Sequence, residues 1–76
     1  MRYMPKEQVE EIKAEFPPGT RLILHEMKDD PMPVEPGTKG TVTHVDAIGT
    51  IHCEFDNGRC LGVCPEVDIF EKIIGE

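Results

Sequence analysis

The sequence predicts a mainly β fold, a small five-stranded barrel behind one N-terminal α-helix. Three observations support this prediction. The 76 residues leave room for one domain with a thin core. An apolar stripe with helical spacing precedes a proline pair, and short apolar segments separated by glycine- or proline-containing turns follow it. We therefore assign residues 1–16 to the helix and residues 17–76 to the barrel, as parts of a single domain.

The helix is predicted from an apolar stripe near the start of the chain. Val9, Ile12 and Phe16 recur at i, i+3 and i+7, which places them on one side of a helix. Pro5 suits the first turn, where a missing N–H costs nothing, and Pro17-Pro18 ends the helix. Because a free helix of about twelve residues is marginal in water, this one must pack on the domain or on a partner.

The first strand is expected at Arg21–Met27. Its alternation places Leu22 and Leu24 on one face and Ile23 on the other, where the helix could cover it. The second strand is expected at Gly40–Asp46, although its two valines break strict alternation. A β-bulge near Thr43-His44 would bring both valines inward.

The third and fourth strands form the most clearly defined hairpin of the sequence. A three-residue turn with Gly58 in the left-handed conformation sets Cys53 opposite Leu61 and Ile51 opposite Val63. This register places every large apolar side chain of the hairpin on one face, whereas a two-residue turn would not. A tight turn at Pro65–Asp68 then leads to a last strand within 69–74.

Composition narrows the class of partner and the compartment. The net charge of −7 disfavours binding to nucleic acid, because that affinity comes chiefly from Lys and Arg. No apolar run approaches the ~20 residues that span a bilayer, and the first residues lack the apolar stretch of a signal peptide. Three cysteines, an odd number, indicate reduced thiols. We expect a cytoplasmic protein without a membrane partner.

The cysteines are the first candidates for chemistry. In the predicted register Cys60 and Cys64 lie four residues apart on one strand, about 13 Å at ~3.3 Å per residue. That separation opposes a shared zinc ion, and Cys53 points to the other face. His52 lies only diagonally from Cys60, and no third group orients it for nucleophilic catalysis. We expect no metal, no cofactor and no catalytic residues.

Five short segments resemble a known family. Pro17–Arg21, Pro36–Val42, Ile51-His52, Phe55–Gly58 and Pro65-x-Val67-Asp68-x-Phe70 occur in this order. Together they are similar to a small bacterial family catalogued as the domain of unknown function 4314, which is common in gut Firmicutes and in their phages or mobile elements. The resemblance implies an SH3-like barrel and implies no activity.

The best candidate for a binding surface is a long loop stiffened by prolines, from Lys28 to Lys39. In SH3-like barrels this first loop and the next connection, here Asp46–Gly49, flank the usual peptide groove. Exposed apolar groups in such a loop suit contact with a partner, although the loop could instead fold back and cap the barrel end. The candidate residues are Met27, Asp29, Asp30, Met32, Pro33, Val34, Asp46 and Ile48.

These observations favour a non-catalytic protein-interaction or regulatory module, encoded by a phage or mobile element, whose partner is a protein. The alternative is an acidic inhibitor that occupies a basic nucleic-acid site on a host defence or replication enzyme, which the negative charge would suit. Direct nucleic-acid binding is a weaker hypothesis. An enzyme is disfavoured because no nucleophile, base and orienting group come together in the predicted strands.

Overall fold

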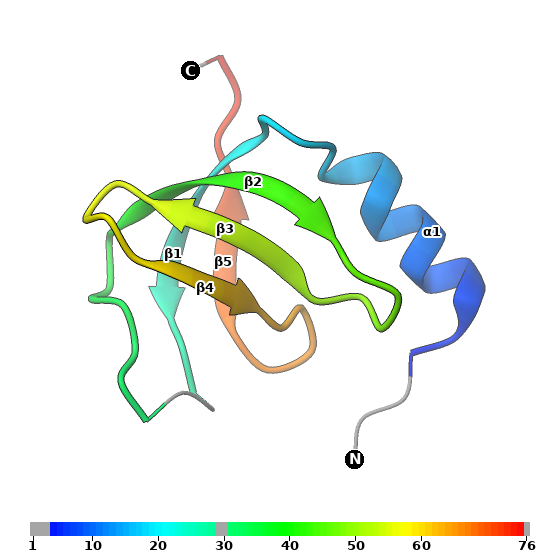
Figure 1. Ribbon diagram of the computed structural model, residues 1–76, viewed down its shortest axis with the longest axis horizontal. Helices are drawn as coiled ribbons and strands as arrows, with labels where there is room; N and C mark the ends of the chain where they lie inside the picture. Colours follow the sequence, from blue (N-terminus) through cyan, green and yellow to red (C-terminus); the bar gives the residue numbers. More distant parts are fainter. Residues whose placement is uncertain (1–3, 29–30, 76) are drawn as a thin grey trace.

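A computed structural model describes residues 4–28 and 31–75 of the chain (Figure 1). These residues form one α-helix and five β-strands, so the prediction of a mainly β domain with one N-terminal helix is confirmed. The elements, in chain order, are α1 (Lys6–Glu15), β1 (Arg21–Glu26), β2 (Lys39–Val45), β3 (Ile51–Phe55), β4 (Cys60–Val63) and β5 (Ile69–Lys72).

The helix uses the predicted apolar stripe. Pro5 is its N-cap residue and Phe16 its C-cap residue. Val9 and Phe16 are buried, and Ile12 packs partly buried against the core. Among the described residues no helix has the length and apolar character needed to cross a membrane.

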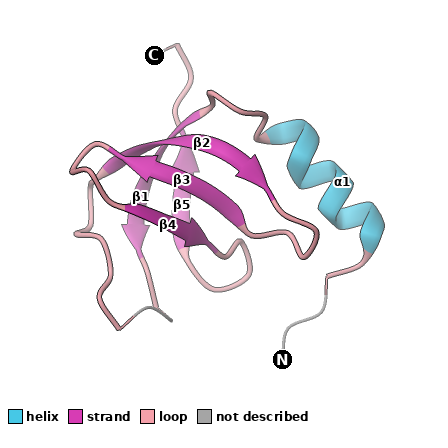
Figure 2. Ribbon diagram, viewed as in Figure 1, coloured by secondary structure: helices cyan, strands magenta, loops and turns pink. Residues whose placement is uncertain are grey.

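All strand pairs are antiparallel, in the order β4-β3-β2-β1-β5. Figure 2 shows β1 and β5 running across the molecule behind β2, β3 and β4. The sheet is open, with β4 and β5 as its edges, so the predicted closed barrel is not confirmed. The turn that connects β4 to β5 is held near the end of β1 by side-chain hydrogen bonds and not by strand pairing. The carboxylate of Asp68 accepts hydrogen bonds from the backbone N–H of Lys28, at 3.0 Å, and of Cys64, at 2.8 Å.

The hairpin of β3 and β4 has the predicted register. Cys53 pairs with Leu61 and Ile51 pairs with Val63. Gly58 has a φ of 90°, a left-handed conformation that favours glycine, and its N–H donates to the carbonyl of Phe55 at 2.9 Å. The three-residue turn therefore closes as predicted.

The predicted β-bulge is also present. The ladder between β2 and β3 shifts between Val42 and His44, so that Thr43 is the extra residue. Val42 is buried, and Val45 packs partly buried against the core. The bulge therefore keeps both valines on the inner face.

One apolar core fills the concave side of the sheet. Gly40 lets it close, because a Cβ atom there would lie 2.8 Å from the ring of Phe55. The fully buried side chains come from β1 to β4 and are Leu22, Leu24, Val42, Ile51, Cys53, Phe55 and Val63.

The helix does not cover Ile23 as expected. Among the described residues β2 is the strand that α1 contacts, and Figure 1 shows α1 beside the end of β2. Phe16 enters the same core as Leu22 and Leu24, so the helix end lies on the inner face of the sheet. Ile23 faces the opposite side and is half-buried.

Candidate functional site

The long loop between β1 and β2 only partly matches its predicted exposure. Met27 and Val34 are 8% and 2% exposed and belong to the core, so the expectation that they face solvent is wrong. Met32, at 70%, and Pro33 are exposed. Asp29 and Asp30 lie outside the described residues.

Backbone hydrogen bonds explain why this loop turns inward. The N–H of Leu24 donates to Thr38 O at 2.9 Å, and the N–H of Gly37 donates to Leu24 O at 2.6 Å. These bonds bring the end of the loop back to β1, and Val34 reaches the core. The loop therefore caps one end of the sheet, as the competing interpretation of the sequence proposed, and leaves Met32 outside.

The connection between β2 and β3 is organised by Asp46. Its Oδ1 accepts hydrogen bonds from the N–H of Ile48, at 3.1 Å, and of Thr50, at 2.9 Å. Its Oδ2 lies 2.8 Å from Nε2 of His52, which donates to it. Although burial works to raise it, the pKa of Asp46 is lowered, because the hydrogen bonds from His52, Thr50 and Ile48 and the charge of His52 outweigh the burial.

Ile48 stands at the tip of this connection. Its side chain is 71% exposed, although it is a large apolar group. The hydrogen bonds of Asp46 hold the backbone on both sides of it, so its position is set by the fold rather than by its own packing.

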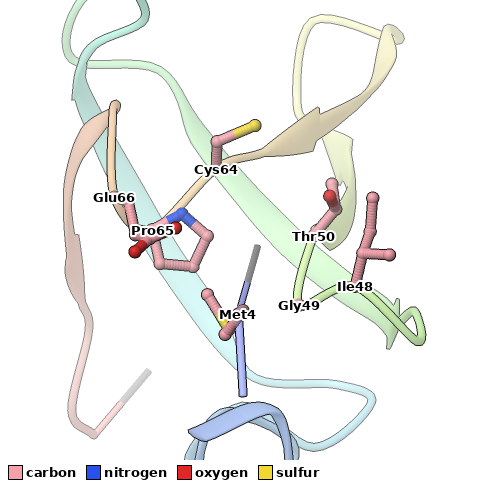
Figure 3. A pocket seen from close by; sticks show the side chains of 7 residues that line it. All are labelled: Met4, Ile48, Gly49, Thr50, Cys64, Pro65 and Glu66. Atoms are coloured by element: carbon pink, nitrogen blue, oxygen red, sulfur yellow. The ribbon is translucent and has the colours of Figure 1, made fainter. Parts of the chain in front are cut away.

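A surface hollow of about 200 Å³ opens next to Ile48 (Figure 3). Three separate segments form it: the residue before Pro5, the β2–β3 connection, and the turn after β4. In the view of Figure 3, Met4 lies between Pro65 and Gly49. The lining residues are Met4, Ile48, Gly49, Thr50, Cys64, Pro65 and Glu66.

Gly49 is essential to the shape of this hollow. Its φ is +88°, and a Cβ atom on it would collide with Sδ of Met4. Met4 is 9% exposed, and together with Val9 it is buried outside the main core cluster. Met4 is therefore packed directly against the β2–β3 connection.

Of the residues that line the hollow, the sequence singled out Ile48, together with Asp46, which holds the same connection but does not line the hollow. Met4, Thr50 and the turn residues Cys64–Glu66 lie far apart in the sequence, and none has the spacing of a recognisable site. The only available signal was an exposed apolar residue before a glycine in a short connection, and this signal is common in loops.

None of the three cysteines forms a disulfide. Cys53 is buried, and burial raises the pKa of its thiol to about 12, which leaves it protonated and inert at neutral pH. Cys60 is exposed, and Cys64 is half-buried at the hollow. Across residues 4–28 and 31–75, no group of three or more His, Cys, Asp or Glu side chains is placed to hold a metal ion.

Two histidines that looked isolated in the sequence meet on the outer face of the sheet. The rings of His44 and His52 stack with centroids 4.4 Å apart and planes 7° from parallel. The bulge at Thr43 sets His44 opposite His52 in the ladder. His25 pairs instead with Glu71, at 3.1 Å on the surface. His52 is also bound to Asp46, so the expectation that no third group orients this histidine is wrong.

The model of one protein family, described as Domain of unknown function (DUF4314), matches residues 5–73. The chain belongs to this family. No curated protein and no solved structure matches the chain. The part shared with other DUF4314 domains includes α1 and all five described strands. It also includes every residue of the hollow except Met4, which lies one position before the match.

Proposed function

We propose that this DUF4314 domain is a non-catalytic protein-interaction module that holds a partner at the hollow beside Ile48. The observation that carries the proposal is the large exposed side chain of Ile48 at the rim of an apolar hollow, on a connection braced by Asp46. Apolar anchors next to pockets dominate the binding energy of many protein interfaces.

The size of the hollow supports a protein partner. Sites for drug-sized ligands and cofactors occupy about 300–1,000 Å³, whereas this hollow measures about 200 Å³. It has room for one side chain of a partner beside Ile48. A free metabolite would be poorly enclosed there.

Charge supports a basic partner. The chain carries 15 acidic and 8 basic residues, and Glu66 lies in the wall of the hollow. A partner that places an apolar side chain next to Lys or Arg would match both features, since complementary charge speeds association and excludes acidic competitors.

The arrangement of the strands also supports the narrower classification as an SH3-like domain. The β4-β3-β2-β1-β5 order, the long first loop and the crossing of β1 and β5 behind the other strands are compatible with it (Figure 2). Three cysteines without a disulfide favour a reducing compartment such as the cytoplasm. An origin in a phage or mobile element remains part of the proposal through the family resemblance.

The test compares two variants with matched exposure. Ile48→Asp places a charge at the rim, and Met32→Asp places the same charge on a side chain that is equally exposed, 70% against 71%. A partner is captured from cells that express the protein, purified, and titrated by calorimetry. We expect Ile48→Asp to weaken binding by about thirtyfold, as at an interface hot spot, and Met32→Asp to leave it unchanged. Equal affinities of the two variants would contradict the proposal.

The net charge of −7 favours a second candidate, an acidic inhibitor that covers the basic nucleic-acid site of an enzyme. Such binding depends on long-range charge and weakens steeply as salt is added. An affinity that stays flat between low and physiological salt would eliminate this candidate and leave the apolar anchor as the main contact.

A further inference from the structure

The edge strand β4 has backbone groups that face away from the sheet. It pairs with β3 on one side and ends the sheet on the other. The N–H of Phe55 donates to Arg59 O at 2.7 Å, which makes these two residues a hydrogen-bonded pair. Because such pairs alternate along an antiparallel ladder, the N–H and C=O groups of Cys60 and Gly62 point away from β3. No other described residue forms a hydrogen bond with them.

This edge lacks the features that usually prevent strand addition. Exposed edges are normally blunted by charged side chains or proline, but Cys60–Val63 contains neither. Cys60 is exposed, and Gly62 presents no side chain on the outer face. The edge is therefore open to another strand.

The edge is continuous with the hollow beside Ile48. A Cβ atom on Gly62 would lie 2.6 Å from Cγ2 of Thr50, so Thr50 packs directly over the glycine. Thr50 also lines the hollow, and Cys64, the residue after β4, lines it too. A strand added to β4 would reach the hollow without leaving the surface.

We propose that an extended, basic segment of a partner protein adds to β4 as a sixth strand, with its main chain paired to Cys60 and Gly62. This inference rests on the proposed function, since the same segment would deliver the side chain that enters the hollow. Strand addition draws affinity from backbone hydrogen bonds and specificity from alternate side chains.

The net charge of the chain favours a basic partner over a second copy of the chain as the source of the added strand. Two copies would each carry a charge of −7, whereas a basic strand would neutralise it. On the outer face, Glu54 pairs across the ladder with Cys60 and is exposed. A Lys or Arg of the added strand would lie two strand spacings from Glu54, about 10 Å between main chains. Two long side chains can bridge that distance.

The experiment uses a synthetic peptide of four Lys-Val repeats and the full chain. Amide hydrogen exchange is followed by NMR with and without millimolar peptide. We expect the peptide to slow exchange at Cys60 and Gly62 at least tenfold. At the other edge, the outward amides of Phe70 and Lys72 should be unchanged. A peptide of four Glu-Val repeats should have no effect.

Two variants at one position separate the backbone from the side chain. Cys60→Pro removes the outward N–H and breaks no bond to β3, because this N–H points away from β3; proline is tolerated at such edge positions. Cys60→Ala keeps the N–H. We expect Cys60→Ala to bind the Lys-Val peptide like the wild type and Cys60→Pro to bind it at least tenfold more weakly. The Glu-Val control keeps the test decisive if Cys60→Pro does not fold.

Several results would overturn the inference. They are the absence of slowed exchange at Cys60 and Gly62, equal slowing by the acidic peptide, and slowing at β5 instead. Concentration-dependent slowing without peptide, with a dimer in sedimentation, would make a second copy the occupant. If the Lys-Val peptide slows exchange at β4 while Ile48→Asp leaves the affinity of the purified partner unchanged, strand addition stands and the hollow is not the binding site.

Discussion

The two edge strands of the sheet, β5 and β4, differ in their side chains. Those of β5 contact residues of other segments, whereas β4 has no charged side chain and no proline. The ring of Phe70 lies 5.7 Å from that of Phe16, and Nζ of Lys72 lies 5.6 Å from the Phe16 ring centroid. Glu71 pairs with His25. By contrast, β4 contains no charged residue. An open sheet needs protection at both edges, and within residues 4–28 and 31–75 such side-chain contacts are found on β5.

The end of the helix provides this protection for β5. Phe16 follows α1 directly and packs both on the core and on Phe70. No comparable element is packed on β4, since α1 contacts β2 among the described strands. The side chain of Phe16 therefore contacts one edge strand, β5, whereas α1 itself contacts β2.

Truncation of Phe16 is the largest change that would break this contrast. Phe16→Ala should lower the free energy of unfolding by about 3 kcal/mol, because it removes a buried ring from the core and from β5. Urea denaturation measures the loss. Hydrogen exchange should accelerate in β5 before β4. Ile12→Ala serves as the control: it removes a half-buried side chain from the same helix and should cost about 1 kcal/mol. Equal acceleration of exchange in both strands would contradict the protective role of Phe16.

Removal of the Asp68 carboxylate tests the link between the two edges. Its oxygens accept hydrogen bonds from the backbone N–H of Lys28, two residues after β1, and of Cys64, one residue after β4. Asp68→Ala leaves two backbone N–H groups without this acceptor, and we expect a loss of about 2 kcal/mol in the free energy of unfolding. Asp68→Asn keeps one oxygen and should lose less. A change below about 0.5 kcal/mol in Asp68→Ala, typical of ordinary surface positions, would show that solvent replaces the carboxylate.

The smallest expected effect concerns Asp46, which positions Thr50 against β4. Its pKa in the folded chain is lowered from 3.8, chiefly by hydrogen bonds that outweigh burial. A lowered pKa stabilises the fold above the unfolded value and loses that effect as the pH falls through the folded value. Asp46→Asn should therefore lower the free energy of unfolding by about 1 kcal/mol at pH 7.

The difference in free energy of unfolding between Asp46→Asn and the wild type should then shrink as the pH falls below about 4. Urea denaturation at pH 7 and at pH 3 measures it, and the comparison with the wild type removes the titration of the other acids. A difference that is constant between the two pH values would mean that the carboxylate charge does not stabilise the loop.

Local features of the fold were predictable from the sequence because their causes are local. The register of the β3–β4 hairpin follows from alternation and turn length, which together permit one arrangement with all apolar groups inside. The bulge at Thr43 follows from two valines out of phase. The helix follows from three apolar residues and a proline on each side.

The candidate site was much less predictable. Met27 and Val34 stand among prolines and acids, and only the closing hydrogen bonds between Leu24 and the loop end reveal that they are buried. The hollow joins three distant segments, and its shape depends on Gly49 making room for Met4. Contacts between residues this far apart in the sequence depend on how the segments pack, and no local sequence pattern predicts them.

The elements of this domain, the register of its β3–β4 hairpin and its family could all be read from the sequence, because spacing and turn chemistry act over a few residues. Three features came from the structure: the open sheet, the contact of Phe16 with Phe70 on β5, and the position of β4 next to the hollow. The contacts that distinguish the two edges come from Phe16 and His25, which lie far from β5 in the sequence. Those positions are set by packing between residues far apart in the chain.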